Sequence, residues 1–243
     1  EYKVVSTPVE ETFKAVYDTN GDANTLTFYY DAVDHSGNGI TVYQDGTDKY
    51  LFDNAQSEGA KWGYNDVRVN VSKVVIDESV KKYSSLTSTA YMFKDMQNAT
   101  DISGAEYLDV ANVTDMSFMF RSYGRDITNF NAVPDVSGWK TDKVTNMTNL
   151  FYYYGYKSTS LAVVPNVSKW NTGNVKNMEN MFYRYGYKSG NIECVLDLSG
   201  WNLANVTAGT YVFYFNPKTF NVTIPAKTGE KANEVGTLHA KWL

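Results

Sequence analysis

Two stretches of the chain, NLFYYYGYKS at Asn149–Ser158 and NMFYRYGYKS at Asn180–Ser189, are nearly identical and lie 31 residues apart. The same interval separates residues of one type along the chain, first the valines and then the phenylalanines: Val113, Val144, Val175 and Val206, and Phe120, Phe151, Phe182 and Phe213. A fixed period of this length is the signature of a repeat protein, in which each unit buries its apolar face against the next unit.

Each unit contains two patterned segments. Valine, methionine and phenylalanine follow one another at i, i+3 and i+7, a spacing that predicts one face of a short helix. Gly124, Gly155 and Gly186 come next and fit the left-handed residue that ends many helices. The alternating blocks 135–139, 166–170 and 197–201, each ending in tryptophan, predict short strands.

These patterns together predict an α/β, leucine-rich-repeat-like solenoid of about five turns, with parallel strands on one face and helical turns on the other. We assign residues 73–225 to this solenoid, with its first strand at 73–77. Residues 1–72 are assigned to an N-terminal β-rich cap, with strands at 13–17, 25–31, 40–44 and 67–71 and an Asn-Gly hairpin between the first two. Residues 226–243 are assigned to a C-terminal cap strand.

The strings LDVANVTDMSFMF (Leu108–Phe120) and WNTGNVKNMENMFYRYG (Trp170–Gly186) resemble the repeats of BspA-like leucine-rich-repeat proteins of bacterial surfaces. The resemblance covers Lys73–Pro225 and implies an exported bacterial protein, adhesin-like or without known activity. The chain departs from that pattern in two respects. Its period exceeds the usual leucine-rich range of about 20 to 29 residues, and Tyr-x-Tyr-Gly-Tyr replaces the small residue and cysteine that follow the phenylalanine in that family.

Composition restricts the classes of function. The 243 residues carry 22 lysines and arginines against 27 acids, a net charge of -5, which does not favour nucleic acid as a partner. No apolar run is long enough to span a bilayer, and the single cysteine excludes an intrachain disulfide. The chain begins at Glu1, which suggests that a leader or anchor was removed. We expect a secreted or surface-displayed monomer.

The tyrosine-rich insertion is the first candidate binding site. Its aromatic rings and five cations, against Asp126 alone, suit a protein or glycan ligand. The alternative is a structural ladder of packed tyrosines. The candidate residues are Arg121, Tyr123, Arg125, Tyr152, Tyr154, Tyr156, Lys157, Tyr183, Arg184, Tyr185, Tyr187 and Lys188.

The outward side chains of the expected strands form a competing candidate site on the concave face of the solenoid, where such proteins often bind partners. These residues are Asp135, Ser137, Asn166, Ser168, Asp197 and Ser199.

Other constellations favour structural interpretations. Residues 18–25, DTNGDANT, read as a hairpin turn, since a calcium loop needs glycine and a carboxylate where Ala23 and Tyr29 stand. Cys194 is in register with core positions, and His35 and His239 have no motif-like partners. We therefore expect no metal, no cofactor and no enzymatic activity, and a binding function. The alternatives are a carbohydrate-active enzyme or glycan-binding module, and a spacer without a ligand.

Overall fold

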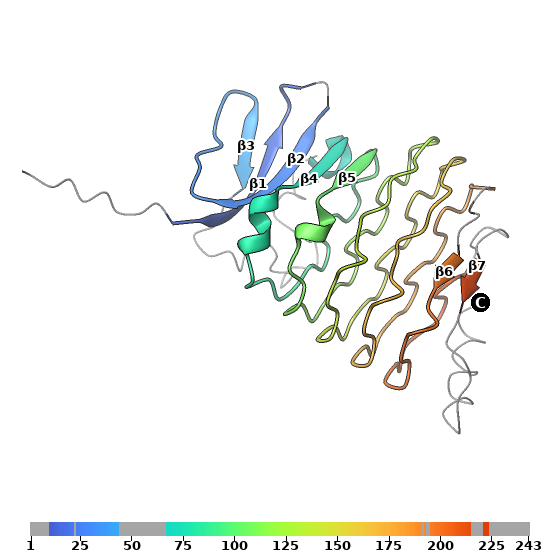
Figure 1. The fold of residues 1–243 in the computed structure, drawn as a ribbon. Helices are drawn as coiled ribbons and strands as arrows, with labels where there is room; N and C mark the ends of the chain where they lie inside the picture. Colours follow the sequence, from blue (N-terminus) through green and yellow to red (C-terminus); the bar gives the residue numbers. More distant parts are fainter. Residues whose placement is uncertain are drawn as a thin grey trace, which may run out of the picture.

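The computed structural model describes residues 10–21, 23–43, 67–190, 192, 195–214 and 221–223. A sheet lies at the N-terminal end of this part of the chain, and a row of backbone coils follows, side by side, towards β6 and β7 (Figure 1). The predicted C-terminal cap strand at 226–243, Cys194 and His239 lie outside the described residues.

Five strands form one mixed sheet in the order β3-β1-β2-β4-β5. β1 pairs antiparallel with β2 and with β3, whereas β2 pairs parallel with β4 and β4 with β5. The sheet therefore joins the predicted cap to the first repeat strands. The strand bounds are Thr12–Asp18 (β1), Thr25–Asp31 (β2), Ile40–Tyr43 (β3), Lys73–Ile76 (β4) and Asp101–Ser103 (β5).

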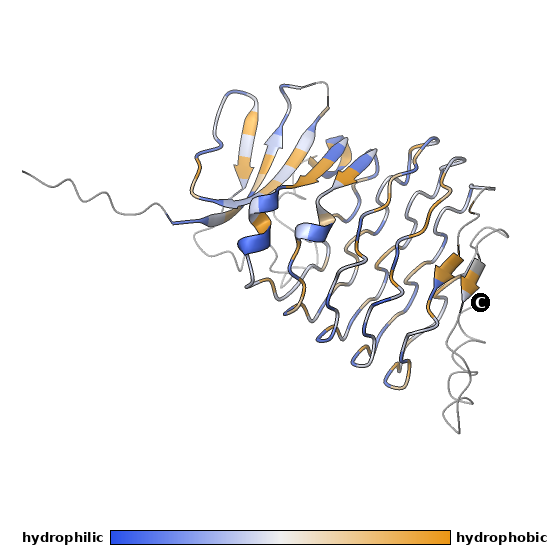
Figure 2. Cartoon of the chain, in the orientation of Figure 1, coloured by the Kyte–Doolittle hydropathy of each residue, from blue (hydrophilic) through white to orange (hydrophobic). Residues whose placement is uncertain are grey.

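Alternating apolar residues explain this sheet. Phe13 and Ala15 of β1, Leu26 and Phe28 of β2, and Val74 of β4 are buried, as expected where every second side chain faces a core. The strands predicted at 13–17 and 25–31 are confirmed, as are those at 73–77 and at 40–44 as far as they are described. Hydrophobic positions recur along the sheet strands and along the coils (Figure 2).

The remaining elements are short. The strand predicted at 67–71 is wrong, because these residues form the helix α1 (Val67–Asn70). Two 3-10 helices follow, η3 (Glu78–Lys82) and η4 (Ala105–Tyr107). At the other end, β6 (Val195–Asp197) and β7 (Asn221–Thr223) pair parallel in a separate two-stranded sheet.

The predicted α/β leucine-rich-repeat-like solenoid is wrong. The sheet is mixed, the described residues contain one four-residue α-helix, and no continuous sheet of parallel strands runs through their repeats. The helical face is absent because Phe118, Asn149 and Asn180 have φ of 61°, 55° and 53°, which a right-handed helix does not accept. The strands predicted at 135–139 and 166–170 are also absent, since these residues form turns.

An alternating hydrogen-bond pattern takes the place of both elements. The N–H groups of Met116, Phe118 and Phe120 donate to carbonyls 30 residues further along, at positions 146, 148 and 150. Each donor–acceptor distance is 2.9 Å. The N–H groups of Met119 and of the following Arg121 donate to the carbonyls three residues back, and the Ser117 N–H donates to Asp115 Oδ1 at 2.8 Å. Every backbone donor in this stretch is therefore satisfied without a helix or a strand.

Parallel bridges keep equivalent residues of successive repeats in register. Asp115 is bridged to Asn146, Asn146 to Asn177 and Asn177 to Ala208. The 31-residue interval in the sequence thus corresponds to direct contact between neighbouring repeats.

Stacked rings form the core between the repeats. Phe120 and Phe151 lie 5.2 Å apart between ring centroids, with 1° between their planes, and Phe182 continues the column at 5.3 Å. Trp139 and Trp170 stack at 5.9 Å, and each indole N–H donates to a carbonyl 34 residues earlier. These columns bury aromatic area and satisfy the indole donors, which stabilises the stacking.

Candidate functional site

The twelve candidate residues of the tyrosine-rich insertion do not share one surface. Tyr123, Tyr154 and Tyr185 are fully buried, so their assignment to a ligand-binding ridge is corrected: they belong to the core. The other nine are at least partly exposed. Of these nine, Arg121, Tyr152, Tyr156, Lys157, Tyr183, Arg184, Tyr187 and Lys188, together with Tyr153, form what we call the tyrosine–arginine surface.

The buried tyrosines are held by hydrogen bonds from their hydroxyl groups. Tyr123 Oη donates to the Asp101 carbonyl at 2.7 Å, Tyr154 Oη to a carbonyl 22 residues earlier at 2.9 Å, and Tyr185 Oη to its equivalent at 3.0 Å. Burial raises the pKa of Tyr123 and of Tyr154 well above the ordinary tyrosine value. These hydroxyls therefore stay protonated and act as structural donors.

A glycine with a left-handed backbone directly follows each of these buried tyrosines. Gly155 has φ of 55°, and a Cβ atom built on it would lie 2.9 Å from Leu161 Cδ2. The glycines were predicted to be left-handed, and they are, but they follow turns instead of ending helices. A larger residue would meet both the backbone strain and the neighbouring side chain.

The outer tyrosines pack against one another along the stacking direction. Tyr152 stacks on Tyr183 at 4.9 Å and 10°, and Tyr156 stacks on Tyr187 at 5.2 Å and 5°. Tyr153 lies between these pairs, 4.4 Å from Tyr152 and 4.8 Å from Tyr156. The rings therefore cover much of each other's faces.

Arginine side chains lie among these rings. The guanidinium carbon of Arg184 is 5.3 Å from the Tyr187 centroid and 5.5 Å from those of Tyr153 and Tyr183, and its Nη1 donates to Tyr153 Oη at 3.1 Å. Arg121 lies 5.5 Å from the Tyr152 centroid. Such cation–π contacts both stabilise the surface and keep positive charge at it.

The carboxylate of this region is shared by two cations. Asp126 accepts from Arg125 at 2.9 Å and from Lys157 at 2.8 Å. The hydrogen bond from Arg125, followed by that from Lys157, lowers the pKa of Asp126 below its ordinary value. Two of the five cations counted in the sequence are therefore paired, while Arg121 and Lys188 form no ion pair with any residue that the structure describes.

The Tyr152 hydroxyl group of this surface can act as a hydrogen-bond donor. Burial, and then the proximity of Tyr153, raise the pKa of Tyr152 to about 12. Its hydroxyl group therefore stays protonated at neutral pH and can donate to an anion or a carbonyl.

Sequence reasoning left several neighbours out of the candidate site. Tyr153 stands in the same run of tyrosines, yet it was omitted from the candidates. Phe118 stacks on Tyr91 at 4.8 Å, and Tyr214 lies 5.8 Å from Tyr183. The 31-residue register could have identified Tyr214, since it is equivalent to Tyr152 and Tyr183.

The competing site consists of turn residues. The Ser137 N–H donates to Asp135 Oδ1, the Ser168 N–H to Asn166 Oδ1 and the Ser199 N–H to Asp197 Oδ1, at 3.0, 3.3 and 2.9 Å. Hydrogen bonds from the serine side chain and backbone lower the pKa of Asp135 and of Asp197. Asp135, Asn166, Asp197 and Ser199 are exposed and Ser137 and Ser168 half-buried, but each pair serves its own turn.

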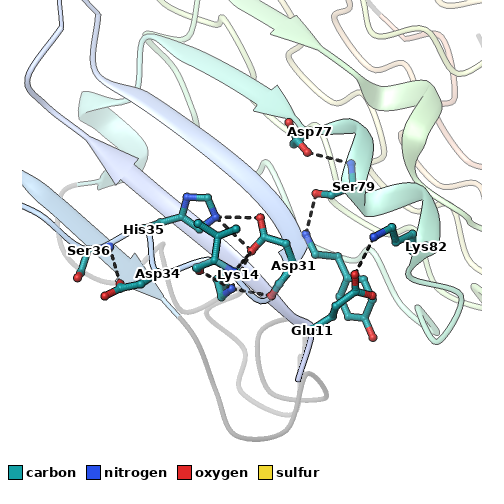
Figure 3. A network of polar contacts seen from close by, with 11 residues as sticks. Glu11, Lys14, Asp31, Asp34, His35, Ser36, Asp77, Ser79 and Lys82 are labelled. Carbon is teal, nitrogen blue, oxygen red and sulfur yellow. Dashed lines mark hydrogen bonds and ion pairs between the residues drawn. The ribbon is translucent and has the colours of Figure 1, made fainter. Parts of the chain in front are cut away.

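A polar network lies on the N-terminal sheet (Figure 3). Lys14, only 5% exposed, donates to Asp31 Oδ1 at 2.8 Å and to the Asp31 and Val33 carbonyls. His35 Nε2 lies 3.0 Å from Asp31 Oδ2, and its ring stacks on Tyr29 at 4.0 Å. His35 thus has a partner that the sequence did not show. All three N–H donors of the Lys14 ammonium group are used, two by Asp31 at the end of β2 and one by Val33 just beyond it.

Few other features suggest chemistry. An open cleft of 290 Å³ lies beside η3 and η4, lined by Lys81, Tyr107 and Trp139 among others, and Lys81 is bonded to Glu78. In the described part of the chain, no three histidine, cysteine or acidic residues gather as metal ligands. No helix described there has the length and apolarity to cross a bilayer.

Comparison with known proteins gives one result. No curated protein and no solved structure matches the chain. A family model described as "Mycoplasma protein of unknown function, DUF285" matches residues 87–227, which is more than half of the 243 residues and contains the whole tyrosine–arginine surface. The chain therefore belongs to the DUF285 family.

Proposed function

We propose that the protein is a non-catalytic binding module that is displayed on, or secreted from, a bacterial cell and attaches to an extracellular macromolecule through the tyrosine–arginine surface. The likeness of its repeats to those of BspA-like surface proteins supports the location. The observation that carries the proposal is the gathering of four partly exposed tyrosines around Arg184.

Rigid aromatic rings with polar edges, next to arginine, have the composition of protein-binding hot spots. Tyr152, Tyr153 and Tyr183 are held by neighbouring rings within 5.8 Å, so few side-chain rotations are lost when a partner binds. The competing face offers serines and carboxylates that already serve turns. The tyrosine–arginine surface is therefore the better docking site.

Binding to arrays of extracellular proteins and glycans tests the proposal. The test variant is Tyr187→Ser with Lys188→Ser, which removes a half-exposed ring and an exposed cation without touching the buried tyrosine column. The control is Lys169→Ser, an exposed residue whose neighbour Trp170 belongs to the other ring column.

A partner that binds the wild type and the control but binds the test variant at least about tenfold more weakly supports the proposal, since this is the loss expected from one interface hot spot. Absence of any partner, or equal binding by the test variant, contradicts it. The thermal midpoint of each variant, followed by circular dichroism, shows that the fold is retained.

A further inference from the structure

We propose that the tyrosine–arginine surface binds a linear acidic polysaccharide, carrying sulfate or carboxylate groups, that lies along the direction in which the repeats stack. This inference rests on the proposed function and names its ligand class.

Neighbouring side chains lie over the faces of the outer tyrosine rings. The two faces of Tyr152 are contacted by Tyr183 at 4.9 Å and by Arg121 at 5.5 Å, and Tyr183 is also contacted by Tyr214 at 5.8 Å. Sugar rings and nucleic-acid bases that need an open aromatic face for stacking lose that contact here. Hydroxyl donors and cations are what the surface presents.

The tyrosine–arginine surface carries more cations than carboxylates. Asp126 is occupied by Arg125 and Lys157, whereas Arg184 and Lys188 lie over the Tyr187 ring at 5.3 and 4.9 Å. The surface is thus positive on a chain whose net charge is -5. An anionic polymer is attracted to this strip and repelled by the rest of the molecule, which confines it to one place.

Side chains of this surface recur at a regular interval along the direction in which the repeats stack. Equivalent rings of successive repeats lie 4.9 and 5.2 Å apart, and Lys157 and Lys188 occupy equivalent positions in two successive repeats. This interval is comparable to the length of one sugar unit in an extended polysaccharide. A chain that carries an anion on each unit or on alternate units can therefore repeat the same contact from one repeat to the next.

The experiment compares dextran sulfate with dextran of the same length, by titration calorimetry of the purified protein at low and at moderate salt. We expect dextran sulfate to bind, dextran not to bind, and added salt to weaken the binding through screening. Lys157→Gln with Lys188→Gln should weaken binding roughly tenfold, the size expected from two exposed ion pairs.

Lys169→Gln with Lys176→Gln is the matched control, because it removes the same charge from two exposed lysines elsewhere on the repeats. Its affinity for dextran sulfate should stay within about twofold of the wild type. Equal losses in both double variants would show a general charge effect and would overturn the inference.

Two further probes separate this inference from the proposed function. Single-stranded DNA that binds more tightly than dextran sulfate, and loses affinity in Lys157→Gln with Lys188→Gln, would overturn the choice of a glycan. A neutral glycan or a protein that binds through Tyr187, without any binding of dextran sulfate, would overturn the inference and leave the proposed function intact. If no probe or arrayed partner depends on this surface, both fail.

Discussion

Replacing Tyr154 and Tyr156 by alanine, one at a time, tests the division between core and surface. The two residues stand two positions apart and look equivalent in the sequence. Tyr154 is fully buried, and its ring centroid lies 5.8 Å from that of Tyr123 and 5.3 Å from that of Tyr185 in the neighbouring repeats. Tyr156 is half-buried, and of the residues at its position in the neighbouring repeats it stacks only on Tyr187. We expect very different losses of stability.

The magnitude for Tyr154→Ala follows from two lost contributions. Truncating a fully buried aromatic ring leaves a cavity between three repeats and costs about 3 to 5 kcal/mol. The carbonyl of Ala132, which accepts from Tyr154 Oη at 2.9 Å, loses its donor, which costs about a further 1 kcal/mol. The free energy of unfolding should therefore fall by about 4 to 6 kcal/mol, a large share of a typical domain's total of about 5 to 15 kcal/mol.

Tyr156→Ala should cost only about 1 to 3 kcal/mol, the contribution of its two aromatic pairs, with Tyr187 and with Tyr153, at a partly solvated site. Tyr154→Phe serves as an intermediate, because it keeps the ring and loses only the hydroxyl hydrogen bond, about 1 to 2 kcal/mol.

Urea unfolding followed by tryptophan fluorescence measures all three variants against the wild type. If Tyr156→Ala lowers the stability as much as Tyr154→Ala, the assignment of one ring to the core and the other to the surface is refuted.

Three other substitutions extend these expectations. Gly155→Ala should lower the stability by about 1 to 3 kcal/mol in urea unfolding, because alanine is strained at a φ of 55° and its Cβ meets Leu161; no loss would contradict that backbone conformation. Trp170→Phe should cost about 1 to 3 kcal/mol, since a buried carbonyl loses the indole donor at 2.9 Å, and an unchanged thermal midpoint would contradict the hydrogen bond. Asp126→Asn should flatten the acid limb of a curve of stability against pH. Folding lowers the pKa of Asp126, so this residue stabilises the fold fully above its unfolded pKa of about 3.9. That stabilisation is lost as the pH falls through the folded pKa. An identical acid limb in wild type and variant would contradict the shared ion pair with Arg125.

The sequence predicts contact between repeats but not the backbone that makes it. Residues at equal positions, such as Asn146 and Asn177, are bridged as the 31-residue interval predicts. The spacing of valine, methionine and phenylalanine predicts a helix because those residues share one side, and they are indeed buried together. A chain of turns places the same residues inward, and apolar spacing alone does not distinguish the two.

One signal against the helix was present in the sequence. Asn149 and Asn180 occupy the left-handed position of their repeats, and asparagine adopts that conformation more readily than most residues. Phe118 stands at the equivalent position of the preceding repeat and carries no such preference. Its left-handed backbone is imposed by the hydrogen bond of its N–H to the Thr148 carbonyl of the next repeat, which is a tertiary contact.

The sequence predicts where the candidate site lies but not which of its side chains are exposed. The sequence shows that tyrosines and cations gather after each phenylalanine, but a run such as Tyr152, Tyr153 and Tyr154 does not show which ring turns inward. The buried hydroxyl of Tyr154 finds a carbonyl 22 residues earlier, and that partner follows only from the folded chain. Amphipathic tyrosine suits both places, so composition alone cannot assign it.

This double use of tyrosine links the surface to the core. Hydrogen bonds between repeats fix the spacing of the backbone, and the inner column of Tyr154 and Tyr185, 5.3 Å apart, lies beside the outer pair of Tyr156 and Tyr187, 5.2 Å apart. The outer residues can therefore change their chemistry while the backbone spacing is kept, as where Arg121 occupies the position that Tyr152 and Tyr183 hold in the next two repeats. For the polymeric ligand that we propose, such a surface would keep a constant step while its charge varies, and specificity between ligands would then depend on the outer positions.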